Sequence, residues 1–357
     1  MNFIKALFVI CLSSWCYSQE LFHIAPDKSY KTKQADLDLF GDPKNPAFKA
    51  GIPYRTSNHG AVTIYNWQFP NEMTSDGDLG FVQNPEAQIR HIARTENEVV
   101  YDAIYTFDRY SRRITPVKKT ASYDKFITLF GCSYAYGNAL NDDQTINYNI
   151  AVQNKEFYPY NYAIGATGIN STLALVQKTD FSSQIPEKIG LFVEVYIGAH
   201  VDRAAGSLPS LQWLQYTPFY AVTADDKVER RGSFRTGRPI YNFIMQLVAR
   251  LFGSNILSGR IFPSLTADDY TYYCRLAEEV RDTLKNKSPK SEFVIYVHPL
   301  ERLDPGLKSC FISRQIKFIE PVPLNPNEYK IKYDGHPSAK ANERIAKDLI
   351  DFAEKEF

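Results

Sequence analysis

The chain has 357 residues, of which 44% are hydrophobic, so it is long enough and apolar enough to form a full globular core over about two domains. Its 41 lysines and arginines nearly balance its 40 aspartates and glutamates, which leaves a net charge of +1. This balance excludes a general positive field for nucleic acid or an anionic membrane, so we expect no nucleic-acid partner. Aromatic residues make up 14% of the chain and could either fill the core or face sugar rings.

Residues 1–19 have the pattern of a secretory signal peptide. Lys5 precedes an apolar run at residues 6–12, which is far shorter than the ~20 residues that a membrane-spanning helix needs. Small side chains at Cys16 and Ser18 suit cleavage near residues 18–19, whereas a bulky Trp15 makes Cys16 a poor lipidation site. We therefore expect a secreted or periplasmic protein with no transmembrane segment; the alternatives are a lipoprotein and a buried N-terminal strand.

Three cysteines remain beyond the predicted signal peptide: Cys132, Cys274 and Cys310. An odd number in an exported protein permits one disulfide and one free thiol. Cys132 lies inside the motif described below, so a bridge, if one forms, is expected between Cys274 and Cys310. The sequence contains no Cys-x-x-Cys or clustered histidine pattern, so we predict no structural zinc site and no cofactor.

Residues 20–120 predict a β-rich N-terminal extension. They are rich in proline, glycine, asparagine and aspartate between short β-prone runs, such as residues 61–65 and 99–105. No catalytic constellation is expected in this extension.

Residues 121–357 predict one α/β domain, because strand and helix signals alternate from there on. The predicted strands are residues 126–130, 160–164, 189–197, 293–297 and 316–319. The predicted helices are residues 146–155, 171–178, 240–252, 266–286 and 338–356, and residues 204–238 are expected to be irregular. Such alternation indicates a mainly parallel sheet covered by helices on both faces, with sites at the carboxyl ends of the strands.

Two short motifs carry the candidate chemistry. Ser133 follows a predicted strand and a glycine, and a serine in a strand-to-helix turn can expose its hydroxyl to a substrate. Asp334 and His336 lie two residues apart just before the last predicted helix. From one loop, His336 can take the proton of the serine hydroxyl while Asp334 supports the imidazole. We therefore predict Ser133 as nucleophile, His336 as base and Asp334 as its partner; a simple turn serine is the alternative for the first motif.

These motifs resemble, in order, the four blocks of the SGNH (GDSL-like) hydrolases. The blocks are Gly131-Cys-Ser133 with Gly137, then Gly165, then the loop at Gly198, then Asp334-Gly-His336-Pro337. The resemblance covers residues 124–357 and implies a three-layer α/β/α flavodoxin-like domain with esterase or acyl-transfer chemistry. It also implies that the backbone N–H groups of Ser133 and Gly165 form an oxyanion hole. Where the family places an oxyanion-binding Asn, this chain has His200, whose imidazole can also donate a hydrogen bond.

The substrate prediction is an acylated carbohydrate. Residues 101–110 are similar to the lead-in of exported bacterial SGNH proteins associated with surface polysaccharides. Trp213 and Tyr216 could stack on sugar rings or simply pack on the core. The prediction is thus an exported serine esterase that removes, or transfers, a small acyl group such as acetyl through an acyl-enzyme on Ser133. The alternatives are a catalytically inactive polysaccharide-binding or assembly protein, and a lipase or thioesterase.

Overall fold

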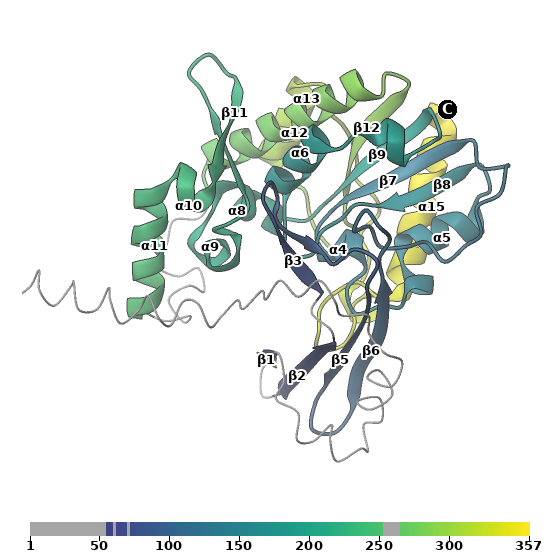
Figure 1. Ribbon diagram of the computed structural model, residues 1–357, viewed down its shortest axis with the longest axis horizontal. Coiled ribbons are helices and arrows are strands. Elements are labelled where there is room, and N and C mark those ends of the chain that lie inside the picture. Colours follow the sequence, from purple (N-terminus) through teal and green to yellow (C-terminus); the bar gives the residue numbers. More distant parts are fainter. Residues whose placement is uncertain (1–54, 60–61, 70–71, 253–264) are drawn as a thin grey trace, which may run out of the picture.

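The computed structural model describes residues 55–59, 62–69, 72–252 and 265–357 (Figure 1). The predicted signal peptide and the first part of the predicted N-terminal extension lie outside the described residues. None of the helices in these ranges is both long enough and apolar enough to span a bilayer.

A five-stranded parallel sheet forms the centre of the protein, with the strand order β13-β12-β9-β7-β8. Its strands, in chain order, are β7 (Lys125–Gly131), β8 (Phe157–Asn161), β9 (Ile189–Tyr196), β12 (Ser291–Val297) and β13 (Lys317–Ile319). Counted from the first strand of the sheet, this is the 2-1-3-4-5 order of flavodoxin-like folds. Continuous apolar runs form these strands because both faces of a parallel sheet are buried.

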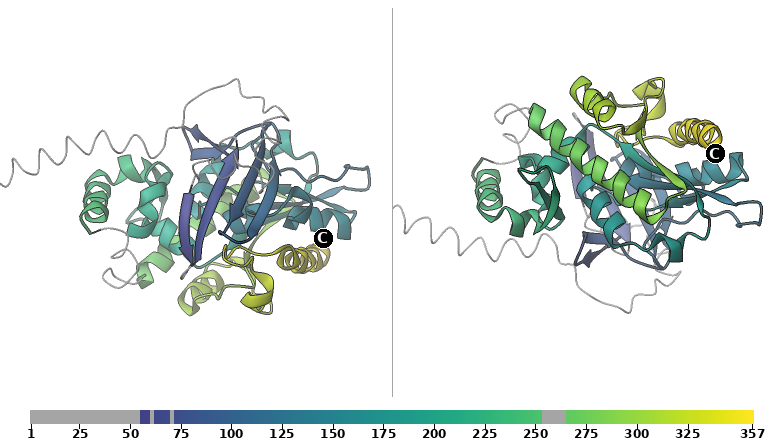
Figure 2. Two further views of the ribbon diagram at one scale, coloured as in Figure 1. Left: turned by 90° about the horizontal axis from the view of Figure 1, so that it is seen from below. Right: turned by 90° about the horizontal axis from the view of Figure 1, so that it is seen from above.

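Helices cover both faces of this sheet, as Figure 2 shows for α12 and α15. The covering helices are α5 (Ile146–Gln153) and α15 (Ala339–Glu356) on one face, and α6 (Ile169–Lys178) and α12 (Ala267–Lys287) on the other. Neighbouring strand residues point to opposite faces, so Phe126 joins the core beneath α6 and α12 whereas Ile127 joins the core beneath α5 and α15. The predicted three-layer α/β/α architecture is confirmed.

The shorter helices lie at the ends and edges of the sheet. They are α4 (Ser133–Tyr136), α7 (Phe181–Gln184), α8 (Ala199–Ala205), α9 (Leu208–Leu214), α10 (Phe234–Gly237), α11 (Pro239–Phe252), α13 (Pro305–Ser313), α14 (Pro326–Tyr329) and the 3₁₀ helix η1 (Asp142–Gln144).

The prediction that residues 204–238 are irregular is wrong. Besides α9 and α10, they form an antiparallel hairpin of β10 (Pro218–Val222) and β11 (Val228–Ser233). Strand β11 is charged and largely exposed, so it lacks the apolar alternation by which a half-buried strand is predicted.

The described part of the N-terminal region forms a separate antiparallel sheet with the order β1-β2-β5-β6, which lies below the parallel sheet in Figure 1. Its strands are β1 (Arg55–His59), β2 (Val62–Phe69), β5 (Gln88–Arg94) and β6 (Val99–Thr106), and a second hairpin is formed by β3 (Met73–Asp76) and β4 (Gly80–Gln83). Buried side chains of β6, among them Tyr105, join the same core as Ile127 of β7. The two sheets are thus packed together through one hydrophobic cluster.

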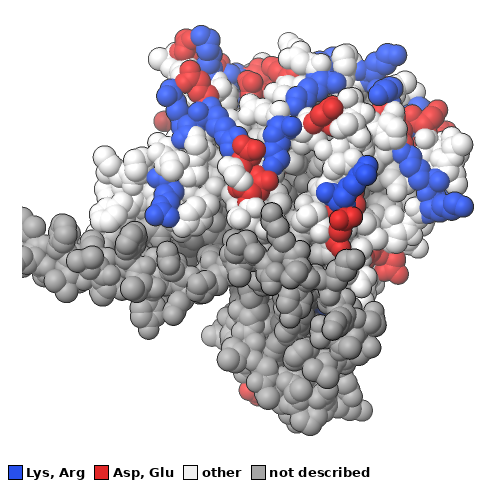
Figure 3. All heavy atoms as spheres, in the orientation of Figure 1, with Lys and Arg blue, Asp and Glu red and all other residues white. Residues whose placement is uncertain are grey.

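Charged side chains of both signs are interspersed over the described face in Figure 3.

Two ion pairs connect the hairpin of β3 and β4 to the α/β domain. Lys178 Nζ lies 2.8 Å from Asp76 Oδ2, and Arg230 Nη1 lies 3.2 Å from Asp78 Oδ1. Partly exposed pairs of this kind contribute about 0–1 kcal/mol each, so they guide the hairpin more than they stabilise it.

A disulfide joins Cys274 of α12 to Cys310 of α13, with the Cα atoms 6.3 Å apart, and Cys132 is a buried free thiol. Because the bond closes a long loop in the unfolded chain, replacing both cysteines with alanine should lower the free energy of unfolding by ~2–4 kcal/mol. Urea denaturation measures this loss. Dithiothreitol should lower the wild-type midpoint toward that of the variant and leave the variant unchanged; equal midpoints without reductant would show that the bond does not form.

Candidate active site

Ser133 is the first residue of α4 and follows directly on β7. The strand ends at Gly131, whose φ is 127°, and a Cβ there would come within 2.9 Å of the carbonyl oxygen of Val195. Only glycine fits this conformation and this close approach. Gly137, with a φ of 85°, ends the helix in the left-handed region. The serine therefore stands on a sharp turn at the carboxyl edge of the sheet, half-buried.

The structure brings Ser133, His336 and Asp334 together. The Ser133 hydroxyl lies 2.9 Å from His336 Nε2, and His336 Nδ1 lies 2.5 Å from Asp334 Oδ1. Burial alone would raise the pKa of Asp334, but the hydrogen bond and the charge of His336 lower it overall. An ionised Asp334 keeps a proton on Nδ1, so Nε2 presents its lone pair to the serine hydroxyl. This arrangement can generate a serine nucleophile.

A tight turn before α15 carries both Asp334 and His336. The backbone N–H of Ile331 donates to the His336 carbonyl at 2.8 Å, and Gly335 N–H donates back to the Ile331 carbonyl at 3.0 Å. The His336 N–H donates to Asp334 Oδ1 at 3.1 Å, so one carboxylate oxygen receives both the backbone and the ring of the same residue. Their relative geometry is thereby fixed within the turn.

Gly165 lies in the loop after β8, beside the nucleophile turn. Ile164 N–H donates to the Gly131 carbonyl at 3.1 Å, which ties this loop to the end of β7. The side chain of Met73, from β3, reaches within 3.4 Å of the place a Cβ would take on Gly165. Ser133 N–H is the first amide of α4 and therefore has no acceptor within its own helix. The two amides predicted to hold an oxyanion thus come from adjoining loops.

His200 is placed in the core rather than at the solvent-accessible edge. It lies on α8, which turns its ring inward, and Nδ1 is 3.5 Å from Glu194 Oε1 on β9. Both ring nitrogens are inaccessible to solvent and have no hydrogen-bond partner among the described residues. Burial lowers the pKa of His200 to about 4, so the ring is neutral at pH 7. Since an oxyanion donor must face the substrate, His200 is not part of the oxyanion hole that we propose below.

Glu194 gives a pH-dependent stability prediction. It is fully buried and accepts a hydrogen bond from Thr172 Oγ1 at 2.9 Å, and burial raises its pKa from 4.5 to about 7. Between these values the unfolded chain releases the Glu194 proton before the folded protein does, so this group removes stability as pH rises. Glu194→Gln cannot titrate, so its unfolding free energy should increase relative to wild type from pH 4.5 to pH 7.

Urea denaturation at a series of pH values measures the difference. The lowered pKa of His200 makes the protein less stable as pH falls. Because His200 is present in both proteins, its contribution to the difference in unfolding free energy largely cancels. A difference between wild type and Glu194→Gln that does not vary with pH would contradict the raised pKa of Glu194.

The two predicted sugar-stacking residues lie in different surroundings. The indole N–H of Trp213 donates to the carbonyl of Ala166 at 3.2 Å, so this half-buried ring sits against the loop that carries Gly165. Tyr216 is 49% exposed, and its hydroxyl accepts a hydrogen bond from Arg235 of α10 at 2.8 Å. Trp213 is thus directly connected to the loop of the predicted oxyanion hole, whereas Tyr216 contacts α10.

Tyr134 and Asn138 also contact the His336 loop, which the sequence analysis did not foresee. The ring of Tyr134 packs 4.9 Å from His298 and 5.5 Å from His336, and its hydroxyl donates to the Gly335 carbonyl at 3.3 Å. Burial lowers the pKa of His298 to about 3, so it forms a neutral wall behind Tyr134. The side-chain amide of Asn138 lies 3.3 Å from His336 Nδ1. Both residues are close to Ser133 in sequence, but their partners are about two hundred residues away.

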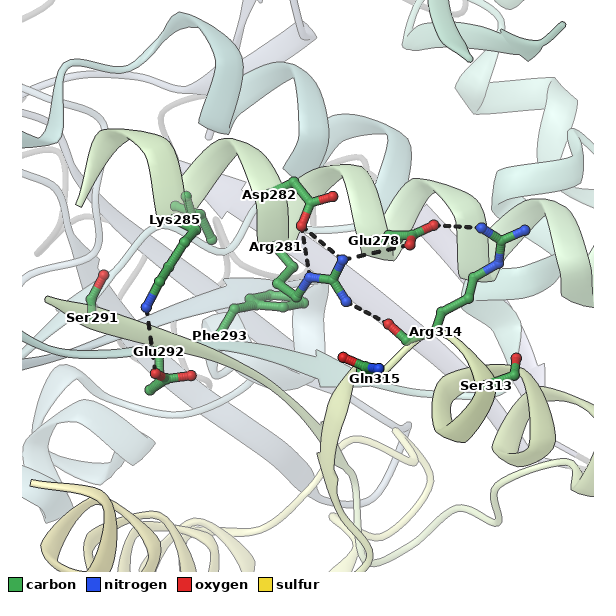
Figure 4. A pocket seen from close by; sticks show the side chains of 11 residues that line it. Glu278, Arg281, Asp282, Lys285, Ser291, Glu292, Phe293, Ser313, Arg314 and Gln315 are labelled. Atoms are coloured by element: carbon green, nitrogen blue, oxygen red, sulfur yellow. Dashed lines mark hydrogen bonds and ion pairs between the residues drawn. The ribbon is translucent and has the colours of Figure 1, made fainter. Parts of the chain in front are cut away.

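A cleft of about 700 Å³ lies elsewhere, among α12, β12 and the end of α13 (Figure 4). Its charged side chains pair with one another: Glu278 lies 3.5 Å from Arg281 and 2.5 Å from Arg314. None of the residues Ser133, His336 and Asp334 lines it. Across the ranges that the structure describes, no group of three or more His, Cys, Asp or Glu side chains is placed to hold a metal ion.

No protein-family model matches the chain, and no curated protein matches it in sequence. Similar solved structures include the acetyl xylan esterase Est2A from the rumen bacterium Butyrivibrio proteoclasticus, with 8% identity, coverage of 76% of this chain and 71% of that one, and a TM-score of 0.38. A family two carbohydrate esterase from Clostridium thermocellum, in complex with cellohexaose, has 11% identity, coverage of 75% of both chains and a TM-score of 0.37. The psychrotrophic esterase EstA from Pseudoalteromonas has 10% identity, coverage of 65% and 97%, and a TM-score of 0.35. Similarity at this level adds nothing to the fold that the strand order already establishes.

Proposed function

We propose that this protein is an exported SGNH-type serine esterase that removes a small acyl group, such as acetyl, from a carbohydrate. One observation carries the proposal: Ser133 Oγ, both nitrogens of His336 and the Asp334 carboxylate form an unbroken hydrogen-bonded chain, with distances of 2.9 and 2.5 Å. This is the geometry in which a serine becomes a nucleophile. The Cys274–Cys310 disulfide supports export, because such bonds persist in oxidising compartments.

The reaction follows from the positions of these groups. Ser133 Oγ attacks the ester carbonyl while His336 Nε2 takes the hydroxyl proton, and Asp334 stabilises the resulting imidazolium. The N–H groups of Ser133 and Gly165 hold the developing oxyanion. His336 then gives its proton to the departing sugar hydroxyl, which leaves an acyl group on Ser133. Water, activated by His336, releases the acid; a sugar hydroxyl in the place of water would make the same protein an acyltransferase.

Two side chains beside Gly165 support the proposal that the substrate is a sugar carrying a small acyl group. Met73 and Trp213 both lie against the loop that carries Gly165, one an apolar side chain and the other a half-buried aromatic ring. The aromatic ring offers a stacking surface for a pyranose.

A panel of p-nitrophenyl acetate, butyrate and octanoate, together with acetate release from acetylated xylo-oligosaccharides, tests the proposal. We expect wild type to hydrolyse acetate fastest, with rates falling as the acyl chain lengthens, and to release acetate from the oligosaccharide. Faster octanoate hydrolysis would indicate a lipase or thioesterase. No hydrolysis above the Ser133→Ala background on any ester would indicate an inactive binding or assembly protein.

A further inference from the structure

A chain of side-chain contacts connects the N-terminal sheet to the proposed catalytic histidine. It starts at Tyr105, a fully buried residue of β6, whose hydroxyl accepts from the Ala139 N–H at 2.7 Å and donates to Asn138 Oδ1 at 3.4 Å. The Asn138 amide nitrogen in turn packs 3.3 Å from His336 Nδ1, whose proton goes to Asp334. In Figure 1, β6 rises from the lower sheet toward α4. Only one side chain, that of Asn138, therefore stands between the N-terminal sheet and His336.

His91 of β5 stands behind Tyr105. Its Nδ1 lies 3.2 Å from the Tyr105 hydroxyl, and its Nε2 lies 3.1 Å from the Tyr101 hydroxyl, which donates to Asn66 Oδ1 at 3.1 Å. Both tyrosine rings pack edge-on against the imidazole, with centroids 5.1 and 5.9 Å away. The imidazole is thus held at both nitrogens and by both neighbouring rings.

Contacts on several sides hold Tyr105 in place, so it can couple the position of His91 to that of Asn138. The Arg113 guanidinium lies 4.3 Å from the centre of its ring. The backbone N–H groups of its neighbours, Ile104 and Thr106, donate to Asn141 Oδ1 at 2.9 Å and to Asp142 Oδ1 at 3.2 Å. Three charged groups act on the pKa of the Tyr105 hydroxyl: the carboxylates of buried Glu72 and of Asp334 raise it, and Arg113 lowers it.

We propose that His91 is a positioning residue of the active site, which acts through Tyr105 and Asn138 to hold His336 against Asp334. This inference rests on the proposed esterase function for its kinetic test. It makes the antiparallel sheet a part of the catalytic unit, although that sheet supplies no reacting atom. A base displaced by ~1 Å can cost about 10²-fold in rate, so removing the support should be visible in kcat.

The kinetic test compares His91→Gln, His91→Ala and Tyr105→Phe with wild type on p-nitrophenyl acetate. We expect kcat to fall about 10- to 100-fold in His91→Ala and Tyr105→Phe, with KM nearly unchanged because the acyl pocket is untouched. His91→Gln, which keeps hydrogen-bonding groups but not the shape of the ring, should lie between His91→Ala and wild type. Tyr123→Phe is the matched control, since this buried hydroxyl bonds the Ala151 carbonyl at 2.9 Å near the start of β7, at the opposite end of the sheet from Ser133. It should keep the wild-type kcat.

A measurement without substrate separates this inference from the proposed function. The proton between His336 Nδ1 and Asp334 should give a downfield proton NMR signal, assigned by its loss in His336→Ala. We expect the signal to shift or broaden in His91→Ala and Tyr105→Phe and to stay in place in Tyr123→Phe. An unchanged signal together with wild-type kcat in His91→Ala and Tyr105→Phe would overturn the inference. A loss of kcat in Tyr123→Phe equal to the loss in those two variants would also overturn it. If wild type hydrolyses no ester, the proposed function fails and the NMR comparison alone decides on His91.

Discussion

Replacing Ser133 with alanine is expected to lower kcat for p-nitrophenyl acetate by about 10⁴-fold or more, with little change in KM. The variant should keep the fold and the amides proposed to bind the oxyanion, but it lacks the Oγ that lies 2.9 Å from His336 Nε2. Without this oxygen no acyl-enzyme forms, and only slow attack by water remains. Steady-state kinetics measure the loss, and Ser309→Ala, an exposed serine on α13, controls for removal of a hydroxyl.

The pairing of Ser133 with His336 can be tested by the lack of additivity of their effects. His336→Ala should cost about as much as Ser133→Ala, because each residue is useless without the other. The double variant should therefore be no slower than either single variant. If the two losses instead multiplied, the two side chains would be acting independently, and the hydrogen-bonded chain would have no catalytic meaning.

Asp334→Asn is expected to give a smaller but still large effect, a loss of kcat of up to about 10⁴-fold at neutral pH. The substitution removes the negative charge that lies 2.5 Å from Nδ1 and stabilises the imidazolium formed during attack. An amide N–H turned toward Nδ1 would also favour the tautomer in which Nε2 carries the proton and cannot accept one from Ser133.

Glu98→Gln is the matched control for this variant. Glu98 pairs with Lys332, two residues before Asp334, so the substitution also removes a carboxylate that contacts the same loop. It should leave kcat at the wild-type value when both variants are assayed side by side. A loss of less than about tenfold in Asp334→Asn would show that His336 does not depend on this carboxylate.

The sequence predicted those parts of the structure that depend on local patterns. Apolar runs identify the strands of a buried sheet, and a glycine before Ser133 and the spacing of Asp334 and His336 point to one site. The second strand was predicted three residues too late, at 160–164, although β8 spans Phe157–Asn161. The residues after it, Tyr162 and Ile164, still donate to Leu129 and Gly131. Apolar character continues there because the chain remains packed on β7 after the ladder ends.

What the sequence could not predict depends on contacts between distant segments. His200 follows Gly198 as the oxyanion Asn would, but a short helix in place of a loop turns its ring toward Glu194. Asn138 and His336 are 198 residues apart, and Tyr105 and Asn138 are 33 apart. No periodicity in the sequence records such meetings, because they follow from how two sheets pack together.

The separation of 203 residues between Ser133 and His336 has a consequence for when activity arises. A chain that emerges from its amino end presents the nucleophile early, but it stays without a base until the turn before α15 has been made and that helix has docked beside α5. Contacts of such long range form late in folding because their loop-closure entropy must be met first. If the protein is the esterase that we propose, an unfinished chain cannot hydrolyse esters, and the onset of activity reports that the tertiary structure is complete.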